Sequence, residues 1–217
     1  MGSGRMIAVI AGTPVDTSMG KSLLEEHGYE AKPFPISDTP EEQSILQVLY
    51  PERLRKIIED KVDEIRAQGM GTVFVYCNSI SAAVDMEDIG NKKGVRMITP
   101  LMVYRDLGKS YRSLAVIAAN SQSACGIEKA LQSGKSDTRV TGLGSLELVD
   151  AVETGMDPEK IVDAFDLESL IGFFRSSGCE ALVLGCTHFS WFRDALVKKS
   201  PIKVIDPALM MLEMLEN

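Results

Sequence analysis

Short apolar runs, each closed by glycine or a polar residue, recur along the chain and predict buried β-strands. The runs are too short for helices and rich in Val, Ile and Leu, which is typical of strands covered on both faces. The predicted strands cover residues 5–12, 72–76, 96–100, 113–119, 140–146, 181–184 and 204–205.

Longer amphipathic stretches separate these runs. Residues 41–68 carry apolar side chains at helical spacing, and Pro51 is expected to bend or break that helix. Asp157 followed by Pro158 predicts the start of a helix over residues 157–177, because Asp is a good N-cap and proline suits the first helical position. The other predicted helices cover residues 21–27, 81–89, 100–107, 125–132 and 207–215.

Alternating strands and helices predict an α/β fold with mainly parallel sheets. The pattern restarts near residue 100, which indicates two similar halves. Ligands of open α/β sheets bind beyond the carboxyl ends of the strands. Polar segments expected to be loops lie at such ends, at residues 13–20, 77–81, 120–123 and 186–188, whereas the Pro- and Ser-rich residues 33–40 form a further predicted loop.

Composition narrows the classes of function. The 217 residues are 45% apolar and 25% charged, with a net charge of −8. An acidic chain without a dense basic cluster repels phosphate backbones, so nucleic-acid binding is not expected. No apolar stretch reaches the roughly 20 residues that span a bilayer, and residues 1–5 read as a small-residue leader rather than a signal peptide. We therefore expect a cytoplasmic protein that does not contact membranes.

The cysteines and histidines argue against a metal site. The four cysteines form no CxxC pair, and the two histidines lack metal-ligand spacing. Cytoplasmic thiols are normally reduced, so disulfides are not expected either. Cys125, inside a predicted helix, and Cys179, just after a helix end, are interpreted as structural residues, and His27 as an exposed helix-end residue.

Cys77 and Cys186 are the candidates for chemistry. Each follows a predicted buried strand and precedes a predicted helix, where the partial positive charge of the helix N-terminus favours a thiolate. Asn78 and Ser79 follow the first cysteine and Thr187 follows the second, and all three can hydrogen-bond a substrate. A single cysteine in such a place is more often a buried apolar residue. Two copies of the same pattern favour function.

Three segments resemble the motifs of the aspartate/glutamate racemase superfamily. Residues 75–82 (Val-Tyr-Cys-Asn-Ser-Ile-Ser-Ala) are similar to its first cysteine motif, and residues 184–189 (Leu-Gly-Cys-Thr-His-Phe) to its second. The Gly-Cys-Thr-His form resembles the glutamate racemase branch. Residues 15–20 resemble the family's Asp-Ser loop with an incomplete glycine pattern. The motifs occur in family order over most of the chain.

The resemblance implies a fold and a domain division. It implies two pseudo-symmetric Rossmann-like α/β domains with an active-site cleft between them. Residues 1–100 with 206–217 would form the first domain and carry Cys77, and residues 101–205 would form the second and carry Cys186. It also implies a homodimer, and a small amino acid or dicarboxylate as the substrate.

The resemblance further implies a reaction and a role for each residue. A racemase without a cofactor would use Cys77 for one enantiomer and Cys186 for the other, and a thiol/thiolate pair can serve as both acid and base. Asp16 would assist the first cysteine and His188 the second, with Glu153 as the partner of the histidine and Glu147 as a competitor for that role. The implied substrate-binding residues are Thr17, Ser18, Asn78, Ser79, Asn120, Ser121, Ser123 and Thr187.

Less specific interpretations and other activities stay open. Asp16 also suits a turn, His188 a helix cap, and Glu153 a solvated surface. Ala119-Asn120 replaces the family's usual Gly-Thr pair, which leaves the identity of the substrate open. The alternatives are another activity of the superfamily, of the hydantoin racemase, maleate isomerase or arylmalonate decarboxylase type, or a ligand-binding protein without catalysis on the same fold.

Overall fold

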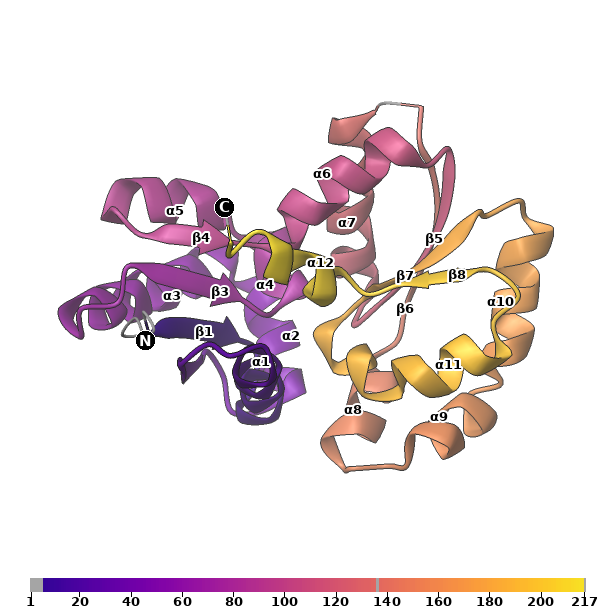
Figure 1. Ribbon diagram of the computed structural model, residues 1–217, viewed down its shortest axis with the longest axis horizontal. Helices are drawn as coiled ribbons and strands as arrows, with labels where there is room; N and C mark the ends of the chain where they lie inside the picture. The colour runs from indigo at the N-terminus through magenta and orange to yellow at the C-terminus, as the bar shows by residue number, and fades with distance from the viewer. Residues whose placement is uncertain (1–5, 136, 217) are drawn as a thin grey trace. The chain divides into compact units, whose positions relative to one another are not determined.

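The computed structural model describes residues 6–135 and 137–216, so the predicted leader at residues 1–5 lies outside the described residues. The chain divides into two compact units, unit 1 over Met1–Pro100 with Met211–Asn217 and unit 2 over Leu101–Met210. Over the described residues each unit contains a four-stranded sheet in which all neighbouring strands are parallel (Figure 1). The predicted α/β class with parallel sheets is confirmed.

Unit 1 has the strand order β2-β1-β3-β4. Its elements are β1 (Ile7–Ala11), α1 (Pro14–Glu26), β2 (Ala31–Pro35), α2 (Pro40–Leu49), α3 (Pro51–Ala67), β3 (Thr72–Val75), α4 (Asn78–Ala83), α5 (Met86–Lys93) and β4 (Arg96–Ile98). The central strands β1 and β3 are buried along their whole length, as expected for strands covered on both faces. The edge strand β2 is buried at only two of its five positions.

Unit 2 repeats this arrangement with the order β6-β5-β7-β8. Its elements are β5 (Ser113–Ala118), α7 (Ser121–Gly134), β6 (Arg139–Gly144), α8 (Leu146–Glu153), α9 (Pro158–Ala164), α10 (Leu167–Ser176), β7 (Ala181–Gly185), the 3-10 helix η1 (Thr187–Phe192), α11 (Arg193–Lys199) and β8 (Lys203–Ile205). The helices α6 (Pro100–Ser110) and α12 (Pro207–Glu213) include the two points where the chain passes from one unit to the other.

Of two segments predicted as loops near the start of the chain, the first is helical from Pro14 onward and the second is a loop only over residues 36–39. Residues 14–20 belong to α1, because the Thr13 hydroxyl oxygen accepts a hydrogen bond from Asp16 N at 3.2 Å and Pro14 occupies the first helical turn. Residues 33–40 contain the end of β2 and the start of α2. Proline cannot donate to a central ladder but is tolerated in an edge strand such as β2.

Two predicted helices are each divided in the structure, one predicted loop is largely helical, and one helix was not predicted. Residues 81–89 lie in two helices, because Asp85 caps a new helix by accepting from Asp88 N. The predicted helix over residues 157–177 is broken at Asp166, whose φ of 47° is left-handed. Residues 121–123 belong to α7 rather than to a loop, and α8 was not predicted. The N-cap role of Asp157 and the break of the long helix at Pro51 are confirmed.

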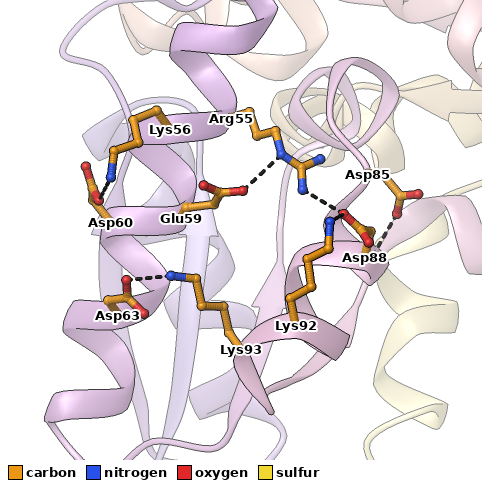
Figure 2. A network of polar contacts seen from close by, with 9 residues as sticks. All are labelled: Arg55, Lys56, Glu59, Asp60, Asp63, Asp85, Asp88, Lys92 and Lys93. Carbon is orange, nitrogen blue, oxygen red and sulfur yellow. Dashed lines mark hydrogen bonds and ion pairs between the residues drawn. The ribbon is translucent and has the colours of Figure 1, made fainter.

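Ion pairs join α3 to α5 on the surface of unit 1 (Figure 2). Arg55 Nη2 lies 2.6 Å from Asp88 Oδ2, and Lys93 Nζ lies 2.6 Å from Asp63 Oδ2. Hydrogen bonds from Lys92 and Arg55 lower the pKa of the Asp88 carboxyl. Such exposed pairs contribute little net stability each, so they orient the two helices rather than hold the unit together.

Candidate active site

Cys77 lies at the carboxyl edge of the unit 1 sheet. It follows β3 by two residues and is the N-cap of α4. Its side chain is buried, and its Sγ lies 3.2 Å from Ser79 Oγ. Asn78 and Ser79, the first residues of α4, are buried as well. The predicted strand–cysteine–helix arrangement therefore places a sulfur with hydroxyl and amide neighbours at this edge.

Asp16 is held beside the end of the neighbouring strand, β1. Its carboxylate Oδ2 accepts a hydrogen bond from Gly12 N at 3.3 Å, and the residue is buried. Because Ile10 pairs with Val75 in the sheet, Gly12 and Cys77 stand at the same level of adjacent strands. The Thr17 hydroxyl donates to the Thr13 carbonyl at 2.5 Å, inside the helix.

Cys186 occupies the equivalent position in unit 2. It follows β7 and is the N-cap of η1, and both it and Thr187 are buried. Its Sγ lies 3.6 Å from His188 Nδ1, and His188 Nε2 lies 2.7 Å from Glu153 Oε1. An ionised carboxylate only accepts, so Nε2 is the nitrogen that donates to Glu153, and Nδ1 faces the sulfur. The result is a chain of contacts from carboxylate through imidazole to thiol.

Glu153 and Glu147 have different surroundings on α8. Glu153 ends the helix with a side chain that is 17% exposed. Glu147 is in the first turn and accepts from Ser145 Oγ at 2.8 Å, which together with backbone hydrogen bonding lowers the pKa of its carboxyl. Of the two candidate partners of His188, the structure brings Glu153 to the ring.

The segment from Asn120 to Ser123 opens α7 at the end of β5. Asn120 Oδ1 accepts from Ser123 N and from Ser123 Oγ, both at 2.9 Å. Ser123 is buried, whereas Ser121 is exposed, as is Ser18 on α1. A Cβ at Gly144 would stand 2.1 Å from the Asn120 carbonyl carbon, so only glycine lets the end of β6 approach this turn. The Asn120 side chain thus occupies the backbone N–H of Ser123, a donor that an anion could otherwise have bound.

Sequence reasoning missed Asp206. It follows β8, the neighbour of β7, and is buried. Its carboxylate accepts from Ser190 Oγ at 2.6 Å and from Ala208 N at 3.0 Å, which ties η1 to the start of α12. Burial raises the pKa of this carboxyl, and burial together with Asp206 and Cys186 raises the pKa of Tyr104 well above its usual value. The signal available in the sequence was a carboxylate directly after a strand.

The other two cysteines, the other histidine and a surface hollow are not part of the two cysteine sites. Cys179 is buried, Cys125 is exposed, and His27 is an exposed C-cap whose Nδ1 lies 2.8 Å from the Leu23 carbonyl oxygen. A hollow of about 550 Å³ is lined by Ser113 and Arg139, at the amino ends of β5 and β6. Among the described residues no cluster of three or more His, Cys, Asp or Glu side chains could hold a metal ion. Nor does any helix in that part of the chain have the length and apolar character needed to cross a membrane.

Known proteins resemble this chain in sequence and in fold, although no family model matches it. It is 26% identical over 167 residues to a glutamate racemase of Fusobacterium nucleatum subsp. nucleatum, covering 74% of this chain and 61% of that protein. The chain thus spans about three fifths of the length of that curated relative.

Two solved structures share the fold. A glutamate racemase from Francisella tularensis in complex with D-glutamate is matched with a TM-score of 0.71 at 18% identity, over 98% of this chain and 80% of that one. An aspartate racemase homologue from Pyrococcus horikoshii gives a TM-score of 0.68 at 15% identity, over 98% of this chain and 100% of that one.

Proposed function

We propose that this chain, a member of the aspartate/glutamate racemase superfamily by its fold and its sequence similarity, is an amino-acid racemase that acts on glutamate or aspartate without a cofactor. The observation that carries the proposal is the repeated placement of a cysteine. Cys77 and Cys186 each follow the third strand of a parallel sheet and cap the helical turn that comes next. The curated glutamate racemase relative supports an amino-acid substrate.

Racemization needs one base on each face of the α-carbon. One thiolate removes the α-proton and leaves a carbanion, and a thiol on the opposite face returns a proton, which inverts the centre. No electron sink is available without a cofactor, so hydrogen bonds and helix dipoles must stabilise the carbanion, at a few kcal/mol per well-placed donor. The thiol suits both roles because its pKa can be tuned close to neutrality.

The two cysteines have different helpers in this scheme. Asp16, which lies on α1 and accepts from Gly12 N at the end of the adjacent strand, would accept and return protons on that side. His188, whose Nδ1 faces Cys186 Sγ, would do so on the other side, oriented by Glu153. Asn78, Ser79, Thr187 and the start of α7 would bind the substrate's charged groups, with Thr17 and Ser18 on the Asp16 side. We expect the two units to close around the substrate, because carbanion chemistry suffers from water.

A second candidate follows from the Asn120 cap. Asn120 Oδ1 already accepts from Ser123 N, so the start of α7 offers one donor fewer to a substrate carboxylate. This favours an uncharged substrate with an acidic C–H, as in a hydantoin racemase. Hydantoins carrying the same side chains are therefore the matched substrates to test beside free glutamate and aspartate.

Loss of the α-proton signal in deuterium oxide tests the proposal directly. Wild-type protein should exchange the α-proton of D- and L-glutamate or aspartate and invert the centre. Cys77→Ala or Cys186→Ala should each lower the rate of racemization at least about 10²-fold, the usual contribution of a positioned acid or base. Cys125→Ala, at an exposed position, is the matched control. Racemization at the wild-type rate in either variant would exclude the two-base scheme.

A further inference from the structure

Two buried side-chain polar atoms of unit 1 have no hydrogen-bond partner within the described residues, and each lies near the end of a strand that neighbours β3, the strand before Cys77. They are Gln43 Nε2 and Thr99 Oγ1. Thr99 follows β4, next to β3, and Gln43 reaches the end of β1 on the other side of β3. A buried amide that lacks a partner costs stability, so its retention calls for an explanation.

Burial and a hydrogen bond hold the Gln43 side chain in position. The residue is 6% exposed and lies in the first turn of α2. Its Oε1 lies 3.1 Å from Ser37 Oγ, whose single hydrogen is shared between this oxygen and the Gly12 carbonyl, 2.7 Å away. In this orientation of the amide, Oε1 faces Ser37 and Nε2 is the donor without a partner.

The Gln43 side chain and the Asp16 carboxylate both lie close to Gly12. A Cβ built at Gly12 would stand 3.3 Å from Gln43 Cγ and 3.8 Å from Asp16 Oδ2. Because glycine has no side chain, both groups can approach the same backbone position. That position is at the level of Cys77 on the adjacent strand. An acceptor and a donor therefore lie close together at the end of β1, the strand next to the one that leads to Cys77, and an amino acid offers the complementary pair, an ammonium group and a carboxylate.

We propose that Gln43 is a substrate-binding residue whose Nε2 donates a hydrogen bond to a carboxylate oxygen of the amino acid held beside Cys77. This inference rests on the proposed function for the identity of the ligand. In the absence of ligand the buried donor lacks an acceptor, and binding supplies it. Gln43 is thereby a determinant of affinity and not of the proton-transfer step.

Two substitutions separate this role from a structural one. Gln43→Leu removes the donor and the unpartnered amide together, so KM for glutamate or aspartate should rise about 10- to 100-fold, the effect of one hydrogen bond to a charged group, while Tm stays equal or rises. Gln43→Glu keeps the shape but places a carboxylate against the substrate carboxylate, so KM should rise further. Gln47→Leu, at the next buried glutamine of α2, is the matched control and should change KM less than twofold.

Calorimetry measures the affinity of each variant for D-glutamate independently of the kinetics. It therefore distinguishes failure of the Gln43 inference from failure of the proposed function. Absence of α-proton exchange in the wild-type protein would reject the proposed function, and the calorimetric affinities of the variants would still report on Gln43. A KM and a D-glutamate affinity for Gln43→Leu within twofold of wild type would overturn the inference. So would an affinity of Gln43→Glu equal to or above that of wild type, because a carboxylate would then be meeting a substrate donor.

Discussion

At the scale of single residues, the contact between Glu153 and His188 decides which nitrogen of the ring carries the proton. The 2.7 Å contact at Nε2 turns Nδ1 toward Cys186, and both side chains are largely shielded from solvent. A carboxylate in this place raises the basicity of the imidazole, because an opposite charge stabilises the protonated ring. Under the proposed mechanism Glu153 would thus act through His188, as a positioning residue rather than one that touches the substrate.

Replacement of Glu153 should change the pH profile as well as the rate. Glu153→Gln keeps the shape but loses the charge, so kcat/KM should fall about 10- to 100-fold, equally in both directions because the two enantiomers have equal free energies. The limb of the profile that depends on His188 should move to lower pH. Steady-state kinetics between pH 6 and 9 measure both. Glu147→Gln on the same helix is the control and should behave as wild type; a similar loss there would assign the effect to α8 as a whole.

The buried carboxyl of Asp206 leads to a prediction about pH. Burial raises its pKa, so the native state holds the proton more tightly than the unfolded chain, whose pKa is near 3.8. The group therefore stabilises the fold at pH values below 3.8, and this contribution is lost as pH rises through the native pKa. In Asp206→Asn the difference in Tm from wild type should accordingly become more positive between pH 4 and pH 8. Asp194→Asn, with a side chain that is 85% exposed, should give a flat difference; an Asp206→Asn curve that is flat or slopes downward would contradict the argument.

At the scale of elements, the position of Asp16 depends on how closely α1 approaches β3. Gly20 of α1 faces the Tyr76 ring, and a Cβ there would stand 2.7 Å from the ring. Tyr76 directly precedes Cys77. The contact between Gly20 and Tyr76 therefore sets the distance between α1, which carries Asp16, and the backbone that leads from β3 to Cys77. Glycine is a poor helix former, and its presence in α1 is explained by this contact.

Gly20→Ala should destabilise the protein although alanine favours helices. We expect a loss of about 1–3 kcal/mol from overpacking against Tyr76, larger than the gain of up to about 1 kcal/mol in helix propensity. Gly172→Ala in α10 is the matched control, because no atom lies within 4 Å of the added Cβ, and it should gain about 0.5–1 kcal/mol. Urea unfolding measures both. Equal effects of the two substitutions would show that the contact with Tyr76 does not limit the approach of α1.

Elements with strong hydrophobic periodicity were predictable from the sequence, whereas several helix boundaries set by local backbone geometry or tertiary contact were not. The buried strands and the long α2–α3 region were correct because their apolar patterns are long or dense. The first turns of α1 were missed because Gly20 and the polar residues after Thr13 suggest a loop. The break at Asp166 was missed because a single left-handed residue leaves no periodic signal.

Some residues of the candidate site were also predictable from the sequence, and others were not. The places of Cys77 and Cys186 at strand ends follow from local sequence, since each is adjacent to a buried strand. The pairing of Glu153 with His188 joins residues 35 positions apart, and the sequence supported Glu153 only by resemblance, with Glu147 as a competitor. Gln43 and Asp206 became candidates only through burial and hydrogen bonding, which a single sequence does not specify.

At the scale of the whole molecule, each unit has one cysteine after its third strand, and under the proposed mechanism each would supply one sulfur with its own assisting residues. Inversion of a carbon centre requires a base on each face, so under the proposed mechanism neither unit is sufficient alone. The repeat of strand order 2-1-3-4 in both sheets, with the cysteine after the third strand each time, gives the two halves equivalent chemistry.

A short reagent that links two thiols tests whether the sulfurs can meet across one substrate. In a Cys125→Ser background, which removes the exposed cysteine, dibromobimane should join Cys77 to Cys186 and give a linked peptide pair after digestion. D-glutamate should slow the reaction, because the ligand would fill the space between the sulfurs. Cys77→Ala in the same background should give single alkylation of Cys186 and no linked pair. If both thiols are alkylated singly in the parent protein and no link forms, the two bases do not face one carbon, and racemization by this pair is excluded whatever the activity of the isolated cysteines.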